Sequence, residues 1–281
     1  KWSNNANLNT LSCSRVHADQ HAISFKPGSS TQVIFGNDGG VFYSSDLTNA
    51  ATTNAIAARN KEYNVTQFYT AAIHPTVGNN THMAGAQDNG TQQFNTDGMN
   101  ATVDKIGGDG AYCFIDQSIP TYQIASYVYN SFYYSTNSGS SFSTLLDDDN
   151  TGSFINPACY DNNQHALYSY KSSANGGGTI YMVKNINSTP ATSTINVANL
   201  TSNATAFKVS PYTTTSTTLF IGTSSGKLIK LTNANNTPVE TNITGSLPNG
   251  SISCIEIGRD ENELLVTFFN YGLTSKIYYS S

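Results

Sequence analysis

Four aspartates lie in short segments rich in glycine or histidine within the first 110 residues of this 281-residue chain. They are Asp19 in HADQH, Asp38 in NDGG, Asp88 in QDNG and Asp109 in GGDG. Two carboxylates about 5–5.5 Å apart can hydrolyse a glycoside with retention of configuration, and two about 6.5–9.5 Å apart with inversion. Several carboxylates with backbone carbonyls can bind a hard cation such as Ca²⁺. Each aspartate can also cap its own turn.

The turn interpretation is favoured for Asp38 and Asp88, because Asp-Gly-Gly and Asp-Asn-Gly are strong hairpin signals. For Asp109 the flanking glycines fit a tight turn and a close approach to a ligand equally well. We therefore keep Asp38 and Asp109 as candidate catalytic acid or base, and Asp88 and Asn89 as candidate ligand-binding residues.

His17, Asp19 and His21 alternate along the chain, so on an extended backbone their side chains point the same way. Two imidazoles and a carboxylate can hold a transition metal. The favoured alternative is an aspartate that fixes two imidazoles in a hydrogen-bonded layer, because no other His or Cys lies at ligand spacing nearby. We expect no metal here and treat all three as candidate ligand-binding residues.

Two further clusters have a functional and a structural interpretation. The run Asp147, Asp148, Asp149 resembles a Ca²⁺-binding segment, but it lacks the alternating spacing and the glutamate of an EF-hand loop. A solvated acidic loop is favoured, so we expect no cofactor, with Ca²⁺ as the alternative. The tyrosines at 127, 129, 133 and 134 can form a platform for stacking sugars or can pack between strands.

A repeat of about 45 residues organises the chain. Each copy has an apolar strand, a turn with Pro or Asp, a second strand ending near Gly, a tight turn and a third strand. First strands begin near residues 21, 67, 111, 155, 206 and 252. This spacing is typical of four-stranded propeller blades. The sequence predicts an all-β chain, a single β-propeller domain over residues 1–281 with about six four-stranded antiparallel blades, or part of a larger propeller. A β-sandwich is the alternative, but it does not predict so regular a repeat.

Two segments fall outside the three marked strands of each copy. Residues 1–11 are expected to form an outer strand that either closes the last blade or belongs to a preceding one. Residues 54–62 (NAIAARNKE) are the only segment that can form a short helix. The fourth strand is the least marked element of each copy.

Blade topology predicts which loops share a face. Loops that lead into first strands and turns that join second to third strands emerge together, because neighbouring strands are antiparallel. We therefore expect the four aspartates of the opening paragraph to crowd one face, around three consecutive blades.

Composition excludes several classes of function. Charged residues are 11% of the chain and the net charge is −5, with no Lys/Arg cluster that could follow a phosphate backbone, so we expect no nucleic acid. No apolar run approaches the roughly 18–20 residues of a membrane span, so we expect no membrane insertion. The polar start is unlike a signal peptide, so the chain is expected to be a mature product or part of a longer one. Its uncharged polar composition favours a secreted or cell-surface location.

Four cysteines stand without CxxC spacing. This argues against a zinc ribbon or a redox pair. Two interpretations stay open: the four cysteines form two disulfides, or three of them are small buried residues within apolar strands.

Residues 135–142 (STNSGSSF) resemble the Asp-box (BNR) pattern S-x-D-x-G-x-T-W, with Asn and Phe substituted. That turn joins the third and fourth strands in the blades of sialidases, sortilin-type receptors and xyloglucanase-type glycoside hydrolases. Trp2 and the terminal YYSS look like parts of two further boxes. The segments VHADQHAISF, FGNDGGVFYSSD, QFYTAAIHP, AGAQDNGT and GGDGAYCFID, in this order, resemble the sialidase/xyloglucanase-like propellers of large bacterial surface proteins.

The resemblance covers residues 13–145 well and the rest loosely. It implies a β-propeller from a secreted surface protein of the kind exported by type IX secretion, with other domains in a longer parent chain. Sialidase activity is not expected, because the three arginines, Arg15, Arg59 and Arg259, are poorly placed to clamp one carboxylate. The favoured function is a non-catalytic module that binds a polysaccharide or a surface protein, or that acts as a scaffold. The alternative is a xyloglucanase-type glycoside hydrolase that uses paired aspartates.

Overall fold

The computed structural model describes residues 16–50, 55–61, 66–98, 100–174 and 176–280. The predicted outer strand of residues 1–11 and the expectations for Trp2, Cys13 and Arg15 lie outside these residues. The chain divides into two compact units, Lys1–Gln67 and Phe68–Ser281, and each is described by itself. No helix of the described residues has the length and apolarity of a membrane span.

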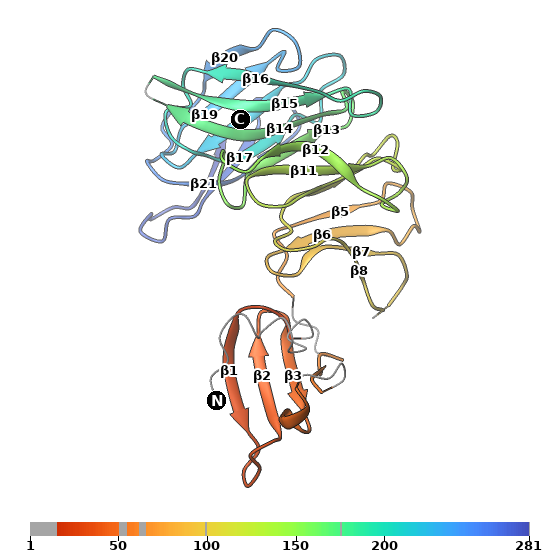
Figure 1. Cartoon of the computed structure of the whole chain (residues 1–281). Coiled ribbons are helices and arrows are strands. Elements are labelled where there is room, and N and C mark those ends of the chain that lie inside the picture. The colour runs from red at the N-terminus through yellow and green to blue at the C-terminus, as the bar shows by residue number, and fades with distance from the viewer. Residues whose placement is uncertain (1–15, 51–54, 62–65, 99, 175, 281) are drawn as a thin grey trace. The chain divides into compact units, whose positions relative to one another are not determined.

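The first unit holds one antiparallel sheet (Figure 1). Its strands, in spatial order, are β1 (Gln20–Phe25), β2 (Val33–Asn37), β3 (Gly40–Ser44) and β4 (Ala57–Ala58). A 3-10 turn, η2 (Leu47–Asn49), follows β3, and the carboxylate of Asp46 caps it by accepting from the amide of Thr48 at 3.0 Å.

The prediction of a short helix over residues 54–62 is wrong for the described part of that segment. Ala57 and Ala58 form β4 and pair with Tyr43 and Phe42 of β3. Alanine has the highest intrinsic helix propensity, but such propensities are small, and pairing with the edge of β3 outweighs them here.

Five antiparallel sheets follow one another in the second unit, and we number the sheets of the whole chain one to six in chain order (Figure 1). Sheet two comprises β5 (Thr70–Ile73), β6 (His82–Ala86), β7 (Gly90–Phe94) and β8 (Val103–Ile106). Sheet three comprises β9 (Cys113–Ile115), β10 (Gln123–Ser126), β11 (Asn130–Ser135) and β12 (Ser143–Asp148). Sheet four comprises β13 (Ala158–Asp161), β14 (Ala166–Ala174), β15 (Gly177–Lys184) and β16 (Ala191–Val197).

Sheet five comprises β17 (Ala204–Val209), β18 (Leu219–Thr223), β19 (Leu228–Thr232) and β20 (Val239–Asn242). Sheet six has three strands within the described residues, β21 (Ile252–Ile257), β22 (Leu264–Phe268) and β23 (Ile277–Ser280). In all six sheets the strands pair in sequence order. The repeat read from the sequence is therefore confirmed, and each first strand begins within a few residues of its predicted position.

Fourth strands are not uniformly weak. β4 has two residues, but β16 has seven and is longer than the first strand of its own sheet. β16 pairs with β15 over its whole length, from Ala191 opposite Lys184 to Val197 opposite Gly178.

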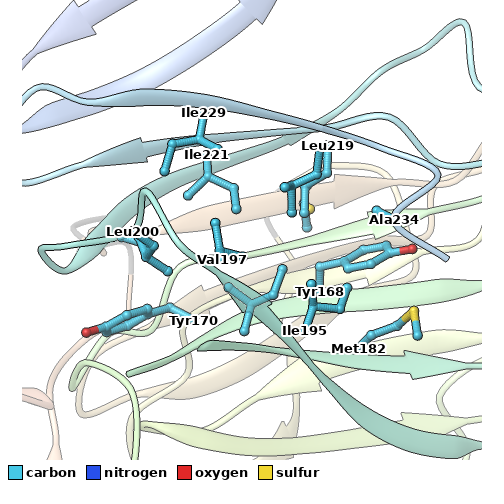
Figure 2. Close-up of a cluster of buried hydrophobic side chains, with 14 of the residues drawn as sticks. Tyr168, Tyr170, Met182, Ile195, Val197, Leu200, Leu219, Ile221, Ile229 and Ala234 are labelled. Carbon is cyan, nitrogen blue, oxygen red and sulfur yellow. The ribbon is translucent and has the colours of Figure 1, made fainter. Parts of the chain in front are cut away.

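The cores of the second unit lie between neighbouring sheets. Figure 2 shows one such core, in which Tyr168 and Ile195 of sheet four face Leu219 and Ile221 of sheet five. Similar clusters join sheets two and three, three and four, and five and six. Full burial of one such aliphatic or aromatic side chain stabilises the fold by about 1.5–3 kcal/mol. Sheets three, four and five thus each share a core with both of their neighbours along the chain.

The strands of each sheet in the second unit end on two sides, and loops of neighbouring sheets meet on each side. At one end, here called the lead-in end, loops that lead into first strands meet the turns between second and third strands. The amide of Gly90 donates to the carbonyl of Gly108 at 2.8 Å, and that of Tyr129 donates to Phe154 at 3.0 Å. At the opposite end, loops between first and second strands meet one another, as when the Tyr212 hydroxyl donates to the carbonyl of Gly258.

The described cysteines are free thiols. Cys113 and Cys159 are buried and Cys254 is exposed. The expectation of small buried residues holds for the first two, and none of the three forms a disulfide.

Candidate functional site

The backbone of the HADQH segment is not extended throughout. Asp19 has φ +56°, in the left-handed region, and β1 begins only at Gln20. A bulge follows, since pairing with β2 shifts between Gln20 and Ala22. The alternation expected for His17, Asp19 and His21 requires extended backbone, which Asp19 does not have, so the shared face of their side chains stays a prediction.

His21 pairs with a residue in the turn between β2 and β3. Its Nε2 pairs with Oδ1 of Asp38, in the turn between β2 and β3. The turn itself is capped by Asn37, whose side-chain oxygen accepts from the amide of Gly39 at 3.0 Å. Asn37 therefore caps this turn, and Asp38 contacts His21; the expected role of Asp38 as a cap of its own turn stays a prediction.

His17 lies against the same turn. A Cβ at Gly39 would come within 2.4 Å of the Cγ of His17, so glycine is required for the imidazole to lie there. Within the first unit, the structure thus brings His17, His21 and Asp38 to one turn.

Asp88 and Asp109 meet at the lead-in end of the second unit. Asp88, with φ +61°, stands in the turn between β6 and β7, and its amide donates to Oδ1 of Asp109 at 2.9 Å. Asn89, beside it, donates from its side chain to the carbonyl of Gln87 at 3.2 Å. Asp109 therefore caps the turn of the preceding sheet.

The glycines around Asp109 serve a close approach of two backbones. The amide of Gly110 donates to Ala86 at 2.9 Å, and a Cβ at Gly110 would lie 2.2 Å from the carbonyl oxygen of Gly90. A Cβ at Gly108 would meet the ring of Tyr127 at 2.6 Å. Of the two interpretations left open for GGDG, the structure supports a tight turn packed on its neighbour.

The two candidate catalytic residues fall in different units, Asp38 in the first and Asp109 in the second. Each unit is described by itself, so a joint action of Asp38 and Asp109 stays a prediction. The same holds for the expectation that all four aspartates share one face.

In the acidic run of residues 147–149, the carboxylate of the middle residue is engaged in hydrogen bonds. The carboxylate of Asp148 accepts from the hydroxyl of Tyr181, in the next sheet, and from that of Thr151, both at 2.7 Å. The hydrogen bond from Tyr181 is the main cause of a lowered pKa of Asp148. Asp147 and Asp149 are exposed. The run therefore joins two sheets through Asp148, and its other carboxylates are solvated, as the sequence favours.

The turn of residues 135–142 lies between β11 and β12, the third and fourth strands of sheet three. The buried hydroxyl oxygen of Ser135 accepts from the amides of Asn137 and Gly139, at 3.2 and 2.9 Å. The side-chain oxygen of Asn137 accepts from the amide of Ser141 at 3.0 Å. Phe142 then packs on the core between sheets two and three. Two side chains thus fold this turn onto itself.

Two aromatic pairs have exposed members, and the sequence had singled out one of their four residues, Tyr129. At the lead-in end, Tyr129 and Phe154 have centroids 6.0 Å apart with rings at 90°. Phe269 and Tyr271, after β22, have centroids 6.3 Å apart, and they are 71% and 90% exposed.

The loop that carries the second pair is anchored. The amide of Phe269 donates to the carbonyl of Ser251 at 2.9 Å, and the amide of Ser251 donates to the side chain of Asn270 at 2.6 Å. The rings of Phe269 and Tyr271 are therefore held outward on a fixed backbone.

Of the tyrosines 127, 129, 133 and 134, two pack against neighbouring residues and Tyr129 pairs with Phe154. Tyr134 packs on the core between sheets three and four, and Tyr127 packs against Gly108. Tyr129 joins the exposed aromatic group through Phe154.

A cavity of about 590 Å³ opens between β19–β20 of sheet five and β22–β23 of sheet six. Aliphatic walls come from both sheets, and Lys230 and Glu261 form an ion pair within it at 2.9 Å. Burial opposes ionisation of Glu261, but hydrogen bonds from Lys230, Ser210 and Thr218 outweigh it and lower its pKa. No pattern in the sequence indicated this cavity.

No family model matches the chain, and no curated protein matches it. Among solved structures, an ancestral GH74 enzyme matches 94% of the chain with a TM-score of 0.55 at 13% identity. The fold is a β-propeller. The predicted all-β propeller of about six antiparallel blades is confirmed, and the sheets are its blades. The match covers 36% of the GH74 enzyme, so this chain spans about a third of its length. A structure of YCF48 bound to D1 peptide matches 90% of this chain and 75% of its own, at 11% identity and a TM-score of 0.49.

Proposed function

We propose that the chain is a non-catalytic propeller module of a secreted or cell-surface protein, and that it binds polysaccharide through exposed aromatic side chains at the lead-in end of the second unit. The observation that carries this proposal is the pair Phe269 and Tyr271, which stand largely in solvent on an anchored loop.

The chemistry of these rings fits sugars. A pyranose ring has an apolar C–H face edged by hydroxyls, and aromatic side chains offer a rigid apolar surface with a polar edge. Because the loop is already held by Ser251 and Asn270, little conformational entropy is lost when a ligand settles on it. Tyr129 and Phe154 extend the same chemistry on another blade of the same end.

The roles of the acidic residues support binding over hydrolysis. One carboxylate oxygen of Asp109 accepts a hydrogen bond from the amide of Asp88, and Asp38 is paired with His21. Asp109 thus holds a turn, and Asp38 contacts an imidazole. A xyloglucanase-type mechanism would need two carboxylates free to face one glycosidic bond.

The setting of the module is part of the proposal. The network of Ser135 and Asn137 supports the Asp-box interpretation of residues 135–142, and the low charge of the chain supports an extracellular location. Membership of a longer surface protein exported by type IX secretion rests on the sequence segments that resemble such propellers.

The test is a panel of soluble and insoluble polysaccharides, scored separately for binding and for release of reducing ends. We expect binding without release, and a loss of affinity of tenfold or more in the double variant Phe269→Ala/Tyr271→Ala. Tyr212→Ala, which removes a half-exposed ring at the opposite end, should bind as the parent does. Reducing-end release that disappears in Asp109→Asn would instead establish the hydrolase. If the double variant binds with the affinity of the parent protein, the aromatic site is refuted.

A further inference from the structure

A second cavity, of about 350 Å³, is lined by loops of sheets four and five at the end opposite the lead-in end. Its lining comes from four connections: the loops between β13 and β14 and between β17 and β18, and the turns after β15 and after β19. The described lining residues carry five amide side chains, two hydroxyls and one ammonium, and none of them carries a carboxylate or an aromatic ring. The cavity is therefore polar throughout and holds a single charged group.

The turns after β15 and β19 are built alike. Asn185 and Asn233, which line the cavity, have φ values of +58° and +51°. The residues that follow them, Ile186 and Ala234, are buried, and their amides donate to the loop between the first two strands of their own sheet at 3.1 and 2.9 Å. Both asparagines are therefore held at the cavity by an anchored backbone.

A chain of amide groups joins the two sheets along one wall of the cavity. Asn235 donates from Nδ2 to Oε1 of Gln164 at 3.0 Å, and Gln164 donates from Nε2 to the carbonyl of Thr214 at 3.0 Å. The oxygen of the Asn235 side chain accepts from the amide of Thr217 at 2.9 Å. These side chains are fixed before any ligand arrives, which lowers the entropy lost on binding.

Other polar groups of the lining have no partner in the protein. Within the residues that the structure describes, the side-chain amides of Asn185, Asn233 and Asn236 form no hydrogen bond. The ammonium of Lys184, the last residue of β15, forms neither a hydrogen bond nor an ion pair among these residues. Three amides and one cation thus stand ready to bind a ligand.

We infer that this cavity binds a hexuronate residue, which is a pyranose ring with one carboxylate, through polar contacts alone. Its volume lies within the range of about 300–1,000 Å³ of small-molecule sites, but such sites are mostly apolar. A lining of amides and hydroxyls fits a ligand covered with hydroxyls, because an amide side chain both donates and accepts hydrogen bonds, as a sugar hydroxyl does. The site is separate from the aromatic residues of the lead-in end and does not depend on the function proposed for them.

The charge of the lining selects the acidic group. One ammonium without a carboxylate partner favours a ligand with one negative charge, and the resulting hydrogen bond is charge-assisted. A carboxylate has two oxygens, which the ammonium of Lys184 and the amide of the adjacent Asn185 can satisfy together. A sulfate ester has three terminal oxygens and would need further donors. The preferred ligand is therefore a carboxylated sugar.

The experiment titrates the methyl glycosides of glucuronate, galacturonate and mannuronate into the complete 281-residue protein. Amide chemical shifts are followed at residues 184–188 and 233–236, and methyl glucoside and its 6-sulfate serve as neutral and sulfated comparators. We expect saturable shifts with at least one uronate, and roughly fivefold weaker binding of methyl glucoside, as the loss of one exposed ion pair predicts. Lys184→Met should weaken uronate binding by the same factor and leave binding of methyl glucoside unchanged.

A second variant removes amides without disturbing the turns. Glycine adopts a positive φ without strain, so Asn185→Gly/Asn233→Gly keeps the backbone of both turns. We expect this double variant to bind uronate and methyl glucoside roughly tenfold more weakly, because hydrogen bonds to both sugars are lost. Lys105→Met, on β8 of sheet two, removes the same charge elsewhere and should bind as the parent does. Phe269→Ala/Tyr271→Ala should also bind the uronate normally, which separates this site from the aromatic one.

Three results would overturn the inference. The first is the absence of saturable shifts with all three uronates. The second is equal affinity for uronate and methyl glucoside, or uronate binding that both Lys184→Met and the double glycine variant leave intact. The third is binding of the 6-sulfate as tightly as the best uronate, which would refute the assignment to a carboxylate.

Discussion

The carboxylate of Asp116, directly after β9, accepts a hydrogen bond from the hydroxyl of Tyr160 in β13 across 2.5 Å between Oδ2 and Oη. The same oxygen lies 2.7 Å from Nδ1 of His165. The other oxygen accepts from the amides of Ser118 and Ile119, each at 2.8 Å. One buried carboxylate therefore holds a turn of sheet three and ties that sheet to sheet four.

The first prediction concerns acid stability. Burial opposes ionisation of Asp116, but the bonds from Tyr160, Ile119 and Ser118 outweigh it and lower its pKa. A lowered folded-state pKa gives stability that is present above the unfolded value of about 3.9 and is lost as pH falls through the folded value. We expect Asp116→Asn to reduce the free energy of unfolding by about 1.5–3 kcal/mol at pH 7, and by less near pH 3.

Urea unfolding at several pH values measures this effect. Asp147→Asn, at an exposed carboxylate, should change stability by less than about 0.5 kcal/mol and serves as control. Equal losses for Asp116→Asn at pH 7 and pH 3 would contradict the role of ionisation.

A second prediction separates a capping role of Asp109 from a catalytic one. Asn keeps an oxygen that can accept from the amide of Asp88, whereas Ala does not. Asp109→Asn should therefore be close to neutral in thermal unfolding, and Asp109→Ala should lose about 1 kcal/mol, as a capping residue does. Equal destabilisation by both substitutions would show that the charge, not the acceptor, matters.

A third prediction tests the close approach of two backbones beside Asp109. At Gly110 a Cβ would lie 2.2 Å from the carbonyl oxygen of Gly90, whereas at Gly107 its nearest neighbour is the Asp104 carboxylate at 3.7 Å. Gly110→Ala should destabilise the second unit strongly, by about 3 kcal/mol or more, because backbone must move to make room. Gly107→Ala, in the same loop, should be tolerated. Calorimetric melting of both variants gives the comparison.

A fourth prediction concerns the turn between β11 and β12. Ser135→Ala removes the acceptor for the amide of Gly139, a buried residue, and should cost about 1–3 kcal/mol. Ser140→Ala, on the exposed side of the turn, should have no measurable effect. Chemical denaturation distinguishes them, and a stable Ser135→Ala protein would mean that the turn does not depend on its side chains.

The strands could be predicted because their signals are local. Apolar and aromatic runs such as AFKVSP and TLFIG end at proline or glycine, and the spacing of these breaks repeats. The helix over residues 54–62 failed for the opposite reason, since Ala57 and Ala58 take their conformation from β3, which lies some fifteen residues earlier.

The candidate site was harder to predict, because it depends on contacts between distant segments. Asp19 has a left-handed φ, which interrupts the extended backbone of HADQH, and no sequence pattern predicts this conformation. The link from Asp109 to Asp88 could be anticipated as a shared end of neighbouring blades, but not as a hydrogen bond. Tyr129 was noticed, whereas Phe154 was not, because its ring partner lies 25 residues away in another blade's loop.

Each hydrophobic cluster of the second unit is shared by two sheets that adjoin in the chain, and by no more distant pair among the described clusters. Loss of one shared core should therefore loosen the two sheets that share it before it affects sheets further along the chain. Damage to the core that contains Tyr168 and Ile221, for example, should loosen sheets four and five first.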